Sequence, residues 1–326
     1  MKTALKVIEK SFKTKLLFAD KILFLDDPAA YSSLAKKAIQ KYGYSPDHNI
    51  NWCEYETHPD QKTIFVYWPD GTALLTHKEE KAWYVFSEPL APIKKRIPNL
   101  IQFINIVLDN PEIKKVVLEL QRDTRRFLKK NLPSQLRDIE INYTLTWPVF
   151  DLKKFDPALP GKFFKRLRNR RNKFYREHKI SVVDAKSFPQ ERLCGIVERW
   201  HERRGARDRT YYHRYQNLIK NNFNGTESAR VILVDNNPVG FNAGWPVPNA
   251  KKHYYAAIGL HDYSLPDLGE ILNIEDLCWI KDAGYLTADF GGGEKDLTNF
   301  KRQFRPTSFY KTFIFSVVRQ EPPAKT

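Results

Sequence analysis

The chain has 326 residues, of which 42% are apolar and 13% aromatic, so it can bury the cores of two domains and is not a disordered chain. Its formal net charge of +16 favours an anionic partner such as nucleic acid, a phosphate-bearing substrate or an acidic membrane surface. Three widely spaced cysteines support neither a disulfide framework nor a zinc site, and no stretch reaches the roughly 18 apolar residues of a membrane span. We therefore expect a cytoplasmic protein that holds no metal, has no transmembrane segment and contacts a membrane only at its surface.

The first half of the chain begins with a helix and continues as a β-meander. Asp27 followed by Pro28 is typical of a helix start, and this helix is expected to end near Gly43. Three short runs rich in β-forming residues then predict an antiparallel meander at 62–68, 72–77 and 82–88. A helix, a strand, a short helix and a strand follow, at 99–109, 114–120, 123–131 and 141–152.

The second half repeats this order of elements. Its meander is expected at 229–235, 239–245 and 252–259, and the helix, strand, helix and strand after it at 268–284, 285–290, 296–304 and 308–318. An α-rich insert, at 162–179 and 189–205, separates the two copies. The pattern predicts a duplicated α/β module, divided into residues 1–156 and 157–326, with the insert at the start of the second part.

The insert contains a strongly basic helix. Residues 162–179 carry nine Lys or Arg and a single Glu. The apolar residues of this helix form a narrow seam that is expected to pack on the protein, made of Phe163, Leu167 and Phe174. Arg170 and Arg171 lie beside that seam, which favours bidentate capture of phosphate, although an entirely solvated charged helix is the alternative. A second cationic cluster at 201–214 adds tyrosines and histidines that can stack on bases.

A run of three glycines follows the strand that ends in Asp289. In ADFGGGEKDLTNFKRQF, 288–304, the strand, glycine run and helix form a corner where backbone N–H groups can face an anion. The run is neither a Walker motif nor GxGxxG, so the glycines alone predict little. On the following helix an apolar stripe leaves Lys301, Arg302 and Arg305 near the C-terminal end. Lys301 there either faces a ligand or complements the helix dipole.

Three segments resemble a known family. FKRLRNRRNKF, YYAAIGLHDYSLPDLGEILNIEDLCWIKDAG and ADFGGGEKDLTNFKRQFRP resemble the C-terminal domain of phosphatidylglycerol lysyltransferases and, more distantly, the FemAB peptidoglycan aminoacyltransferases. YVFSEPLAPIKK, 84–95, resembles a turn of the same family, and the resemblance extends over about residues 25–320. It implies an α/β (α+β) fold of two tandem GNAT-like modules, each with a mixed, mostly antiparallel sheet flanked by helices.

The resemblance also implies an activity. Characterised members take an amino acid from aminoacyl-tRNA and place it on a lipid headgroup or a peptidoglycan precursor, so tRNA is the expected partner and aminoacyl-tRNA the co-substrate, without a further cofactor. The pair Phe300-Lys301 matches the Phe-Lys pair that the family uses near the reacting ester. Arg168 and Asn172 match the Arg-Asn pattern of its basic helix.

The chemistry of such a transfer needs few groups. The aminoacyl ester is already activated, and attack on it generates an oxyanion that a positioned cation stabilises, which is the role expected of Lys301. Asp289 is expected to accept the nucleophile's proton or to orient the α-amino group, with capping of the next turn as the structural alternative. The residues expected to bind substrate are Arg168, Arg170, Arg171, Asn172, Tyr255, Gly291, Gly292, Phe300 and Arg305.

The sequence departs from related proteins in two respects. It shows no stretch expected to span a membrane, unlike full-length lysyltransferases, and LPDLGEIL stands where a GNAT protein would carry its pyrophosphate loop. Two alternatives therefore remain beside the aminoacyltransferase: an acyl-CoA-dependent N-acyltransferase, and a non-catalytic protein that binds RNA or an anionic membrane through the basic helix. The amino acid, the acceptor and the oligomeric state are not specified by the sequence.

Overall fold

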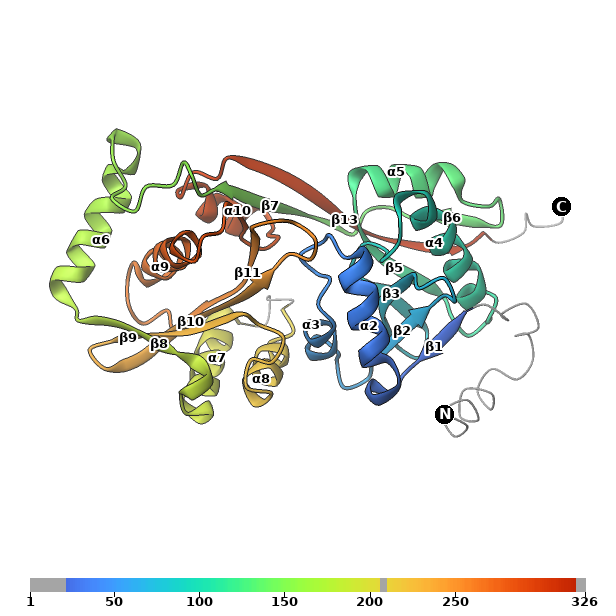
Figure 1. The fold of residues 1–326 in the computed structure, drawn as a ribbon, viewed down its shortest axis with the longest axis horizontal. Helices are drawn as coiled ribbons and strands as arrows, with labels where there is room; N and C mark the ends of the chain where they lie inside the picture. Colours follow the sequence, from blue (N-terminus) through green and yellow to red (C-terminus); the bar gives the residue numbers. More distant parts are fainter. Residues whose placement is uncertain (1–21, 206–209, 321–326) are drawn as a thin grey trace. The chain divides into compact units, whose positions relative to one another are not determined.

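The computed structural model describes residues 22–205 and 210–320, which form two compact units. Unit 1 comprises Met1–Leu145 and Lys311–Thr326, and unit 2 comprises Thr146–Tyr310 (Figure 1). The N-terminal segment and residues 206–209 of the second cationic cluster lie outside the described residues. Among the helices in the described ranges, none combines the length and the apolar character that crossing a membrane requires.

Unit 1 begins with a strand and the predicted N-terminal helix. The side chain of Asp27 accepts a hydrogen bond from Ala29 N at 2.9 Å, and Pro28 occupies the first turn, which fixes where α2 starts. The predicted antiparallel meander is confirmed, and helix α3 precedes it. These elements are β1 (Leu23–Leu25), α2 (Pro28–Tyr42), α3 (Ile50–Tyr55), β2 (Lys62–Tyr67), β3 (Ala73–Lys78) and β4 (Ala82–Val85).

A crossover helix links β4 to a parallel partner strand. Helix α4 (Ile93–Leu108) joins β4 to β5 (Lys115–Gln121), and its apolar face packs on both strands. The predicted start of this helix at residue 99 is wrong, because Pro98 lies inside its second turn instead of ahead of it. Helix α5 (Arg122–Asn131) and the short strand β6 (Leu136–Asp138) complete this part of unit 1.

The predicted helical insert lies in unit 2, after the strand that ends at Asp151. A short 3-10 turn, η2 (Lys162–Phe164), leads into the basic helix α6 (Lys165–Glu177), and an edge strand that the sequence did not predict, β8 (Ile180–Asp184), follows it. The turn η3 (Ala185–Ser187) and two helices, α7 (Gln190–Arg204) and α8 (His213–Lys220), complete the insert.

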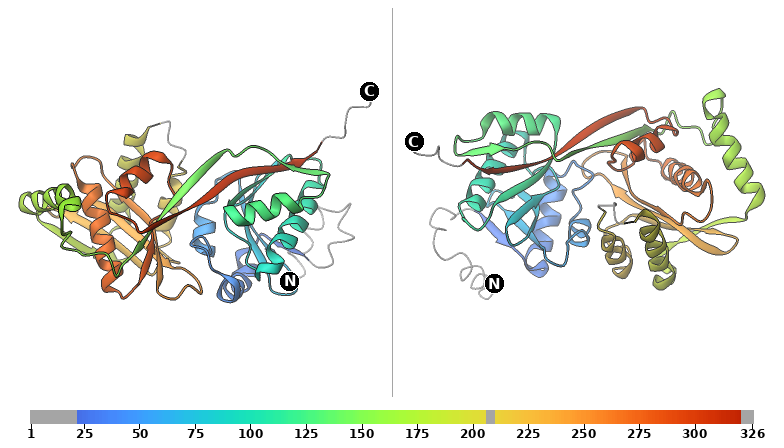
Figure 2. Two further views of the ribbon diagram at one scale, coloured as in Figure 1. Left: turned by 90° about the horizontal axis from the view of Figure 1, so that it is seen from above. Right: turned by 180° about the vertical axis from the view of Figure 1, so that it is seen from behind.

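The second copy of the module then follows in the predicted order. Its elements are β9 (Ser228–Val234), β10 (Asn237–Pro246), β11 (His253–His261), α9 (Leu268–Asp282), β12 (Thr287–Asp289) and α10 (Lys295–Arg302). Strands β9, β10 and β11 form the antiparallel meander, and β12 pairs with β11 in parallel. Helices α6 and α9 lie over one face of this sheet, whereas α7 and α8 lie over the other (Figures 1 and 2).

The two strands that end the modules are exchanged. Strand β7 (Tyr143–Asp151) follows α5 in the sequence but pairs antiparallel with β12, and β13 (Ser308–Arg319) follows α10 but pairs antiparallel with β5. Each copy's last strand therefore completes the sheet of the other copy. The predicted division at residue 156 follows the chain order of the elements and assigns all of β13 to the second module, whereas the C-terminal part of β13 belongs to unit 1.

Candidate functional site

The candidate site of unit 2 begins where β11 and β12 diverge. The two strands pair in parallel over three positions only, the last of which joins Tyr255 to Asp289. The chain after β12 then follows β7 instead, because Phe290 N donates to Pro148 O at 3.1 Å and Gly293 exchanges both backbone hydrogen bonds with Thr146. The glycine run thus leaves β11 directly after Asp289 and lines the point of divergence.

Lys301 reaches back from α10 to this point. Phe300 and Phe304 pack into the core of unit 2 and hold the helix, so that the lysine between them faces the glycine run. The Nζ of Lys301 donates to Phe290 O and, at 3.1 Å, to Gly291 O. Burial of the ammonium group lowers the pKa of Lys301 to about 7. The ammonium group of this lysine therefore contacts the backbone at the start of the glycine run.

Each glycine of the run makes room for a different neighbour. Gly291 has φ +64°, and a Cβ built on it would lie 3.6 Å from Lys301 Nζ and 4.0 Å from Tyr255 Oη. A Cβ on Gly292 would lie 2.6 Å from the indole ring of Trp147. A Cβ on Gly293 would lie 3.0 Å from the side chain of Leu297 in α10. The run is therefore more than a turn, because Gly291 keeps open the space between a lysine and a tyrosine.

Asp289 lies in a buried aromatic cluster beside this space. Its side chain is buried, and Oδ2 accepts a hydrogen bond from Tyr310 Oη at 3.1 Å and lies 3.3 Å from His253 Nε2. Asp289 Oδ1 has no hydrogen-bond partner among the described residues, so it remains available as an acceptor. The ring of Trp147 stacks on Tyr310 at 5.5 Å and contacts Tyr255 at 5.8 Å between centroids.

Sequence reasoning missed three members of this cluster: Trp147, Tyr310 and His253. Trp147 and Tyr310 come from the exchanged strands β7 and β13, more than 150 residues apart in the chain, and no local pattern brings them together. His253 begins β11, two residues before Tyr255 on the same face of the strand, so the period-2 alternation of that strand could have found it.

The arginines of α6 that were predicted to bind phosphate contact groups of the same chain. Arg170 forms an ion pair with Asp267 at 3.3 Å and another with Glu270, both at the start of α9. The guanidinium of Arg171 donates to Pro157 O. The helical wheel placed both side chains beside the packing seam, as observed, but it did not reveal that acceptors of the same chain engage them.

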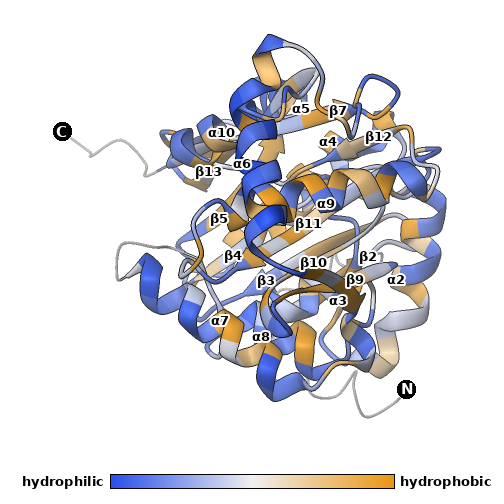
Figure 3. Ribbon diagram, turned by 90° about the vertical axis from the view of Figure 1, so that its left-hand side faces the viewer, coloured by the Kyte–Doolittle hydropathy of each residue, from blue (hydrophilic) through white to orange (hydrophobic). Residues whose placement is uncertain are grey.

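The other predicted residues of α6 also have local contacts. Arg168 donates to Leu159 O, and the side chain of the exposed Asn172 accepts from Arg171 at 3.5 Å. Leu167 and Phe174 are buried as predicted, but Phe163 is 68% exposed, because it lies in η2 and outside the regular helix. The exposed cations on the outer side of α6 give this helix its hydrophilic surface (Figure 3), and they are Lys165, Arg166, Lys173 and Arg176.

Two cations near the end of α10 lie on exposed aromatic rings. The guanidinium of Arg305 is 4.2 Å from the ring centroid of Phe163, and that of Arg302 is 4.6 Å from the ring centroid of Phe309. Both arginines are exposed, and Arg302 directly follows Lys301 in the helix. Unlike Arg170, these two side chains have no ion-pair partner among the described residues, so they present charge and flat apolar surface together.

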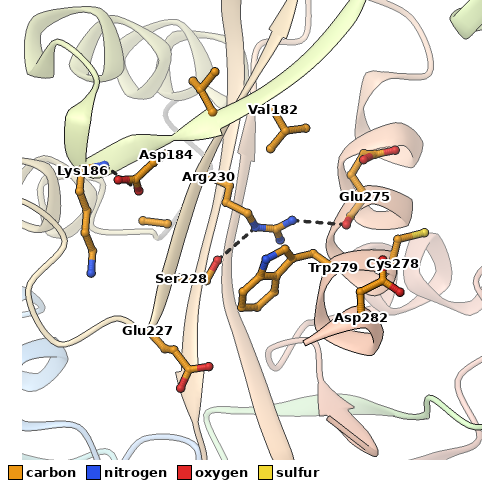
Figure 4. Close-up of a pocket in the computed structure, with 12 residues that line it drawn as sticks. Val182, Asp184, Lys186, Glu227, Ser228, Arg230, Glu275, Cys278, Trp279 and Asp282 are labelled. Carbon is orange, nitrogen blue, oxygen red and sulfur yellow. Dashed lines mark hydrogen bonds between the residues drawn. The ribbon is translucent and has the colours of Figure 1, made fainter. Parts of the chain in front are cut away.

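A separate hollow of about 670 Å³ lies between strands β8 and β9 and helix α9 (Figure 4). Arg230 occupies its floor, where it contacts the ring of Trp279 at 4.5 Å and pairs with the buried Asp276. The guanidinium also donates to Ser228 Oγ at 3.1 Å. None of the predicted site residues lines this hollow, and its central cation is already paired, so we assign no ligand to it.

Comparison with known proteins identifies the fold and the family. The family model for the C-terminal domain of phosphatidylglycerol lysyltransferase matches residues 56–314, whereas no curated protein matches the chain. The structure of L-PGS from Bacillus licheniformis is 16% identical and superposes with a TM-score of 0.64, covering 92% of this chain and 94% of that one.

Two further structures extend the likeness. FemX is 10% identical with a TM-score of 0.56, covering 89% of this chain and 95% of its own. A tandem GNAT protein from the clavulanic acid biosynthesis pathway is 11% identical with a TM-score of 0.55, covering 92% and 99%. At these identities the structures establish the fold and confirm the predicted class, a mixed α/β tandem GNAT-like protein. Because the family model spans most of the sequence, the chain belongs to the family of phosphatidylglycerol lysyltransferase C-terminal domains, a family of aminoacyltransferases.

Proposed function

We propose that this protein transfers an amino acid from aminoacyl-tRNA to an amine or hydroxyl acceptor on a lipid headgroup, a peptidoglycan precursor or a peptide. The observation that carries the proposal is the position of Lys301, whose Nζ lies across the open Gly291 corner from Tyr255. An ammonium group held at the divergence of two parallel strands is suited to an oxyanion that forms there. Because charged tRNA is a cytoplasmic substrate, the proposal implies a cytoplasmic enzyme.

The proposed transfer assigns a role to two side chains of the site, Lys301 and Asp289. The acceptor nitrogen or oxygen bonds to the ester carbonyl carbon, and Lys301 stabilises the oxyanion until the bond to the ribose oxygen breaks. The acceptor loses a proton and the leaving ribose oxygen gains one. The transfer is therefore balanced without a redox step, and it does not require a metal. Asp289 is the proposed first acceptor of that proton, since its Oδ1 is buried beside the site and has no partner within the described ranges.

The end of α10 is the proposed contact for the phosphates and bases of tRNA. Arg302 and Arg305 are exposed, and each lies against an exposed phenylalanine ring, so they can neutralise phosphates while the rings stack on unpaired bases. We propose these two arginines in place of Arg170 and Arg171, because the guanidinium groups of the latter already contact the start of α9 and the chain before α6. The proposed nucleic-acid contact then lies at and just after the C-terminal end of the helix that carries Lys301.

The acyl-CoA alternative is disfavoured by the start of α9. In the second module this helix follows β11, where a pyrophosphate would need free N–H groups and nearby cations. Asp267 instead places a carboxylate at the N-cap and Glu270 a second one in the first turn, and Arg170 is paired with both of them. We therefore expect calorimetry to show no saturable binding of acetyl-CoA or of a longer acyl-CoA.

The test is transfer of radiolabelled amino acids from a full set of charged tRNAs to a panel of lipids, peptides and peptidoglycan precursors. We expect Lys301→Ala to lower the transfer rate by about 10² to 10³ while tRNA binding is kept. Lys295→Ala, which removes an exposed lysine from the first turn of α10, is the matched control and should transfer normally. Absence of transfer from every charged tRNA by the parent protein would contradict the proposal and favour a non-catalytic binding protein.

The tRNA contact is tested separately. Arg302→Ala with Arg305→Ala should weaken tRNA binding and reduce the dependence of log K on log salt by about 0.7 to 0.9 for each lost phosphate contact. Lys173→Ala with Arg176→Ala removes the same charge from the exposed side of α6 and serves as the control. A larger loss in the α6 variant would return the contact to the basic helix.

A further inference from the structure

The carboxylate of Asp289 is buried with one of its oxygens unpartnered. The residue is 2% exposed, and its side-chain partners among the described residues are Tyr310 Oη, which donates to Oδ2, and His253 Nε2, which lies 3.3 Å from the same oxygen. Oδ1 has no partner within the described ranges. Lys301 does not neutralise this carboxylate, because its Nζ donates to two backbone carbonyls. A buried carboxylate oxygen in this state is stabilised most by a cationic donor.

Aromatic rings adjoin the same carboxylate. Tyr255 is the register partner of Asp289, and its ring contacts the rings of Trp147 at 5.8 Å and Trp245 at 5.1 Å between centroids. Tyr310, the hydrogen-bond donor to Asp289, stacks on Trp147. The π-electrons of such rings attract an ammonium group, whereas they offer little to a neutral hydroxyl. The surroundings of Asp289 therefore favour an ammonium ligand.

His253 connects Asp289 with solvent. It begins β11, where Val247 N donates to its carbonyl oxygen at 2.9 Å and its own N–H donates to Ala250 O at 3.1 Å, so its backbone is fixed. Nε2 faces Asp289 and is shielded from solvent, yet the side chain is 25% exposed, so the exposed part of the ring lies away from Nε2. Imidazole is the side chain best suited to pass protons near neutral pH.

The acceptor determines how many protons the site must release. At neutral pH a primary amine is largely an ammonium group, which loses one proton before it can attack and a second after its bond to the ester carbon forms. A hydroxyl loses one proton only, and the leaving ribose oxygen takes it up. Transfer to an ammonium group therefore releases one proton to solvent, whereas transfer to a hydroxyl releases none. A carboxylate alone serves the hydroxyl, but the amine also needs a path to solvent.

We propose that the acceptor is a primary amine, which Asp289 binds as an ammonium group and deprotonates, so that the product is an amide. This inference rests on the proposed transfer function and specifies its acceptor. The N–H bond of the ammonium breaks, the nitrogen keeps the electron pair, and the proton enters the pair of Asp289 and His253. The pair releases a proton to water from the exposed side of the imidazole. The neutral amine then bonds to the ester carbon, and its second proton passes through Asp289 to the leaving ribose oxygen. His253 does not touch the substrate and acts through Asp289 as a positioning residue.

The experiment compares acceptors that differ in the nucleophile. Phosphatidylethanolamine and phosphatidylglycerol are presented in phosphatidylcholine vesicles, and an alanyl peptide with a free N-terminus is compared with its lactyl analogue, which carries a hydroxyl in place of the amine. We expect label from charged tRNA in the amine acceptors, in a linkage that survives mild alkali as an amide does. Label in the hydroxyl acceptors alone, as an alkali-labile ester, would overturn this inference and leave the proposed function intact. Asp289 would then bind the α-ammonium group of the transferred amino acid. Absence of transfer to every acceptor would overturn both.

The role of His253 is tested with His253→Gln. Glutamine still presents a polar group to Asp289 but does not take up a proton, so transfer to the amine acceptors should fall by about 10²-fold and recover in part when imidazole is added. His178→Gln is the matched control, because it removes another histidine paired with an aspartate, 2.9 Å from Asp235, and it should transfer normally. Thermal unfolding should show that both variants are folded. A loss in His253→Gln that imidazole does not restore would overturn the proton path, because the histidine would then serve the fold alone.

Discussion

Replacement of Lys301 by methionine tests whether its ammonium group is held in an unfavourable, desolvated position. Burial lowers the pKa of Lys301 from 10.5 to about 7, a difference of about 3.5 units that corresponds to roughly 5 kcal/mol. The side chain is partly exposed and its Nζ donates to two carbonyl oxygens, so we discount this figure to about 2 kcal/mol. The lysine is therefore expected to cost stability while it is charged.

The pH dependence gives the sign of the effect. In the unfolded chain Lys301 keeps its proton up to its ordinary pKa, whereas in the folded protein it loses the proton above about pH 7. The unfolded state thus binds more protons between about pH 7 and pH 10.5, and the free energy of unfolding of the parent rises with pH in this window. Methionine has no proton to lose, so the stability gained by Lys301→Met is largest below pH 7 and shrinks by about 2 kcal/mol toward pH 10.

Urea unfolding of the parent and Lys301→Met at several pH values across this range measures the difference directly. Lys295→Met, at an exposed position of the same helix, is the matched control and should show a difference that does not change with pH. A gain for Lys301→Met that stays constant or increases with pH would refute the reasoning, because the ammonium group would then not be desolvated in the folded protein.

Three further outcomes follow from the same contacts. Transfer should fall as pH rises through about 7 if Lys301 acts as a cation, and a rate that rises over this range would identify it as a base instead. Gly291→Ala should lower transfer strongly and stability by about 1 to 2 kcal/mol in urea unfolding, because φ is +64° and the new methyl group would fill the space beside Lys301. Arg170→Ala should lower the melting temperature and leave tRNA affinity unchanged, since its loss leaves two carboxylates unpaired at the start of α9. A variant with weakened tRNA binding and normal melting would reverse that assignment.

The sequence predicted the elements better than their pairing. The two meanders and the capped helix at Pro28 depend on local patterns, namely alternation along the strands and an Asp-Pro start, and all of these are confirmed. The exchange of β7 and β13 depends on which sheet edge each strand reaches, and nothing in either strand encodes this locally. Strand β8 was missed for a similar reason, because it is a short edge strand that pairs on one side only.

In the candidate site, too, local patterns predicted individual features but not the contacts between residues that are distant in the sequence. Periodicity predicted the apolar stripe that holds Lys301 between the partly buried Phe300 and the buried Phe304, and the run after Asp289 located the corner that it faces. The helical wheel could not reveal that Arg170 meets the start of α9, because the two carboxylates follow it by about 100 residues. Tyr310, which donates a hydrogen bond to Asp289, was not predicted for a similar reason, because it lies on the exchanged strand β13.

The duplication itself explains why the chemistry is expected in one module only. Strands β4 and β5 also pair in parallel and then diverge, after Val85 and Leu118. In this copy, however, the divergence is occupied by the buried carboxylate of Glu88, which accepts hydrogen bonds from Gln121 N at 2.9 Å and Thr124 Oγ1 at 2.8 Å. A carboxylate that spans the gap joins the two diverging strands and stabilises them, but it would repel the oxyanion that a lysine in the second copy can bind. The first module therefore closes the corner that the second leaves open at Gly291, and we expect substitutions of Glu88 to affect folding rather than transfer.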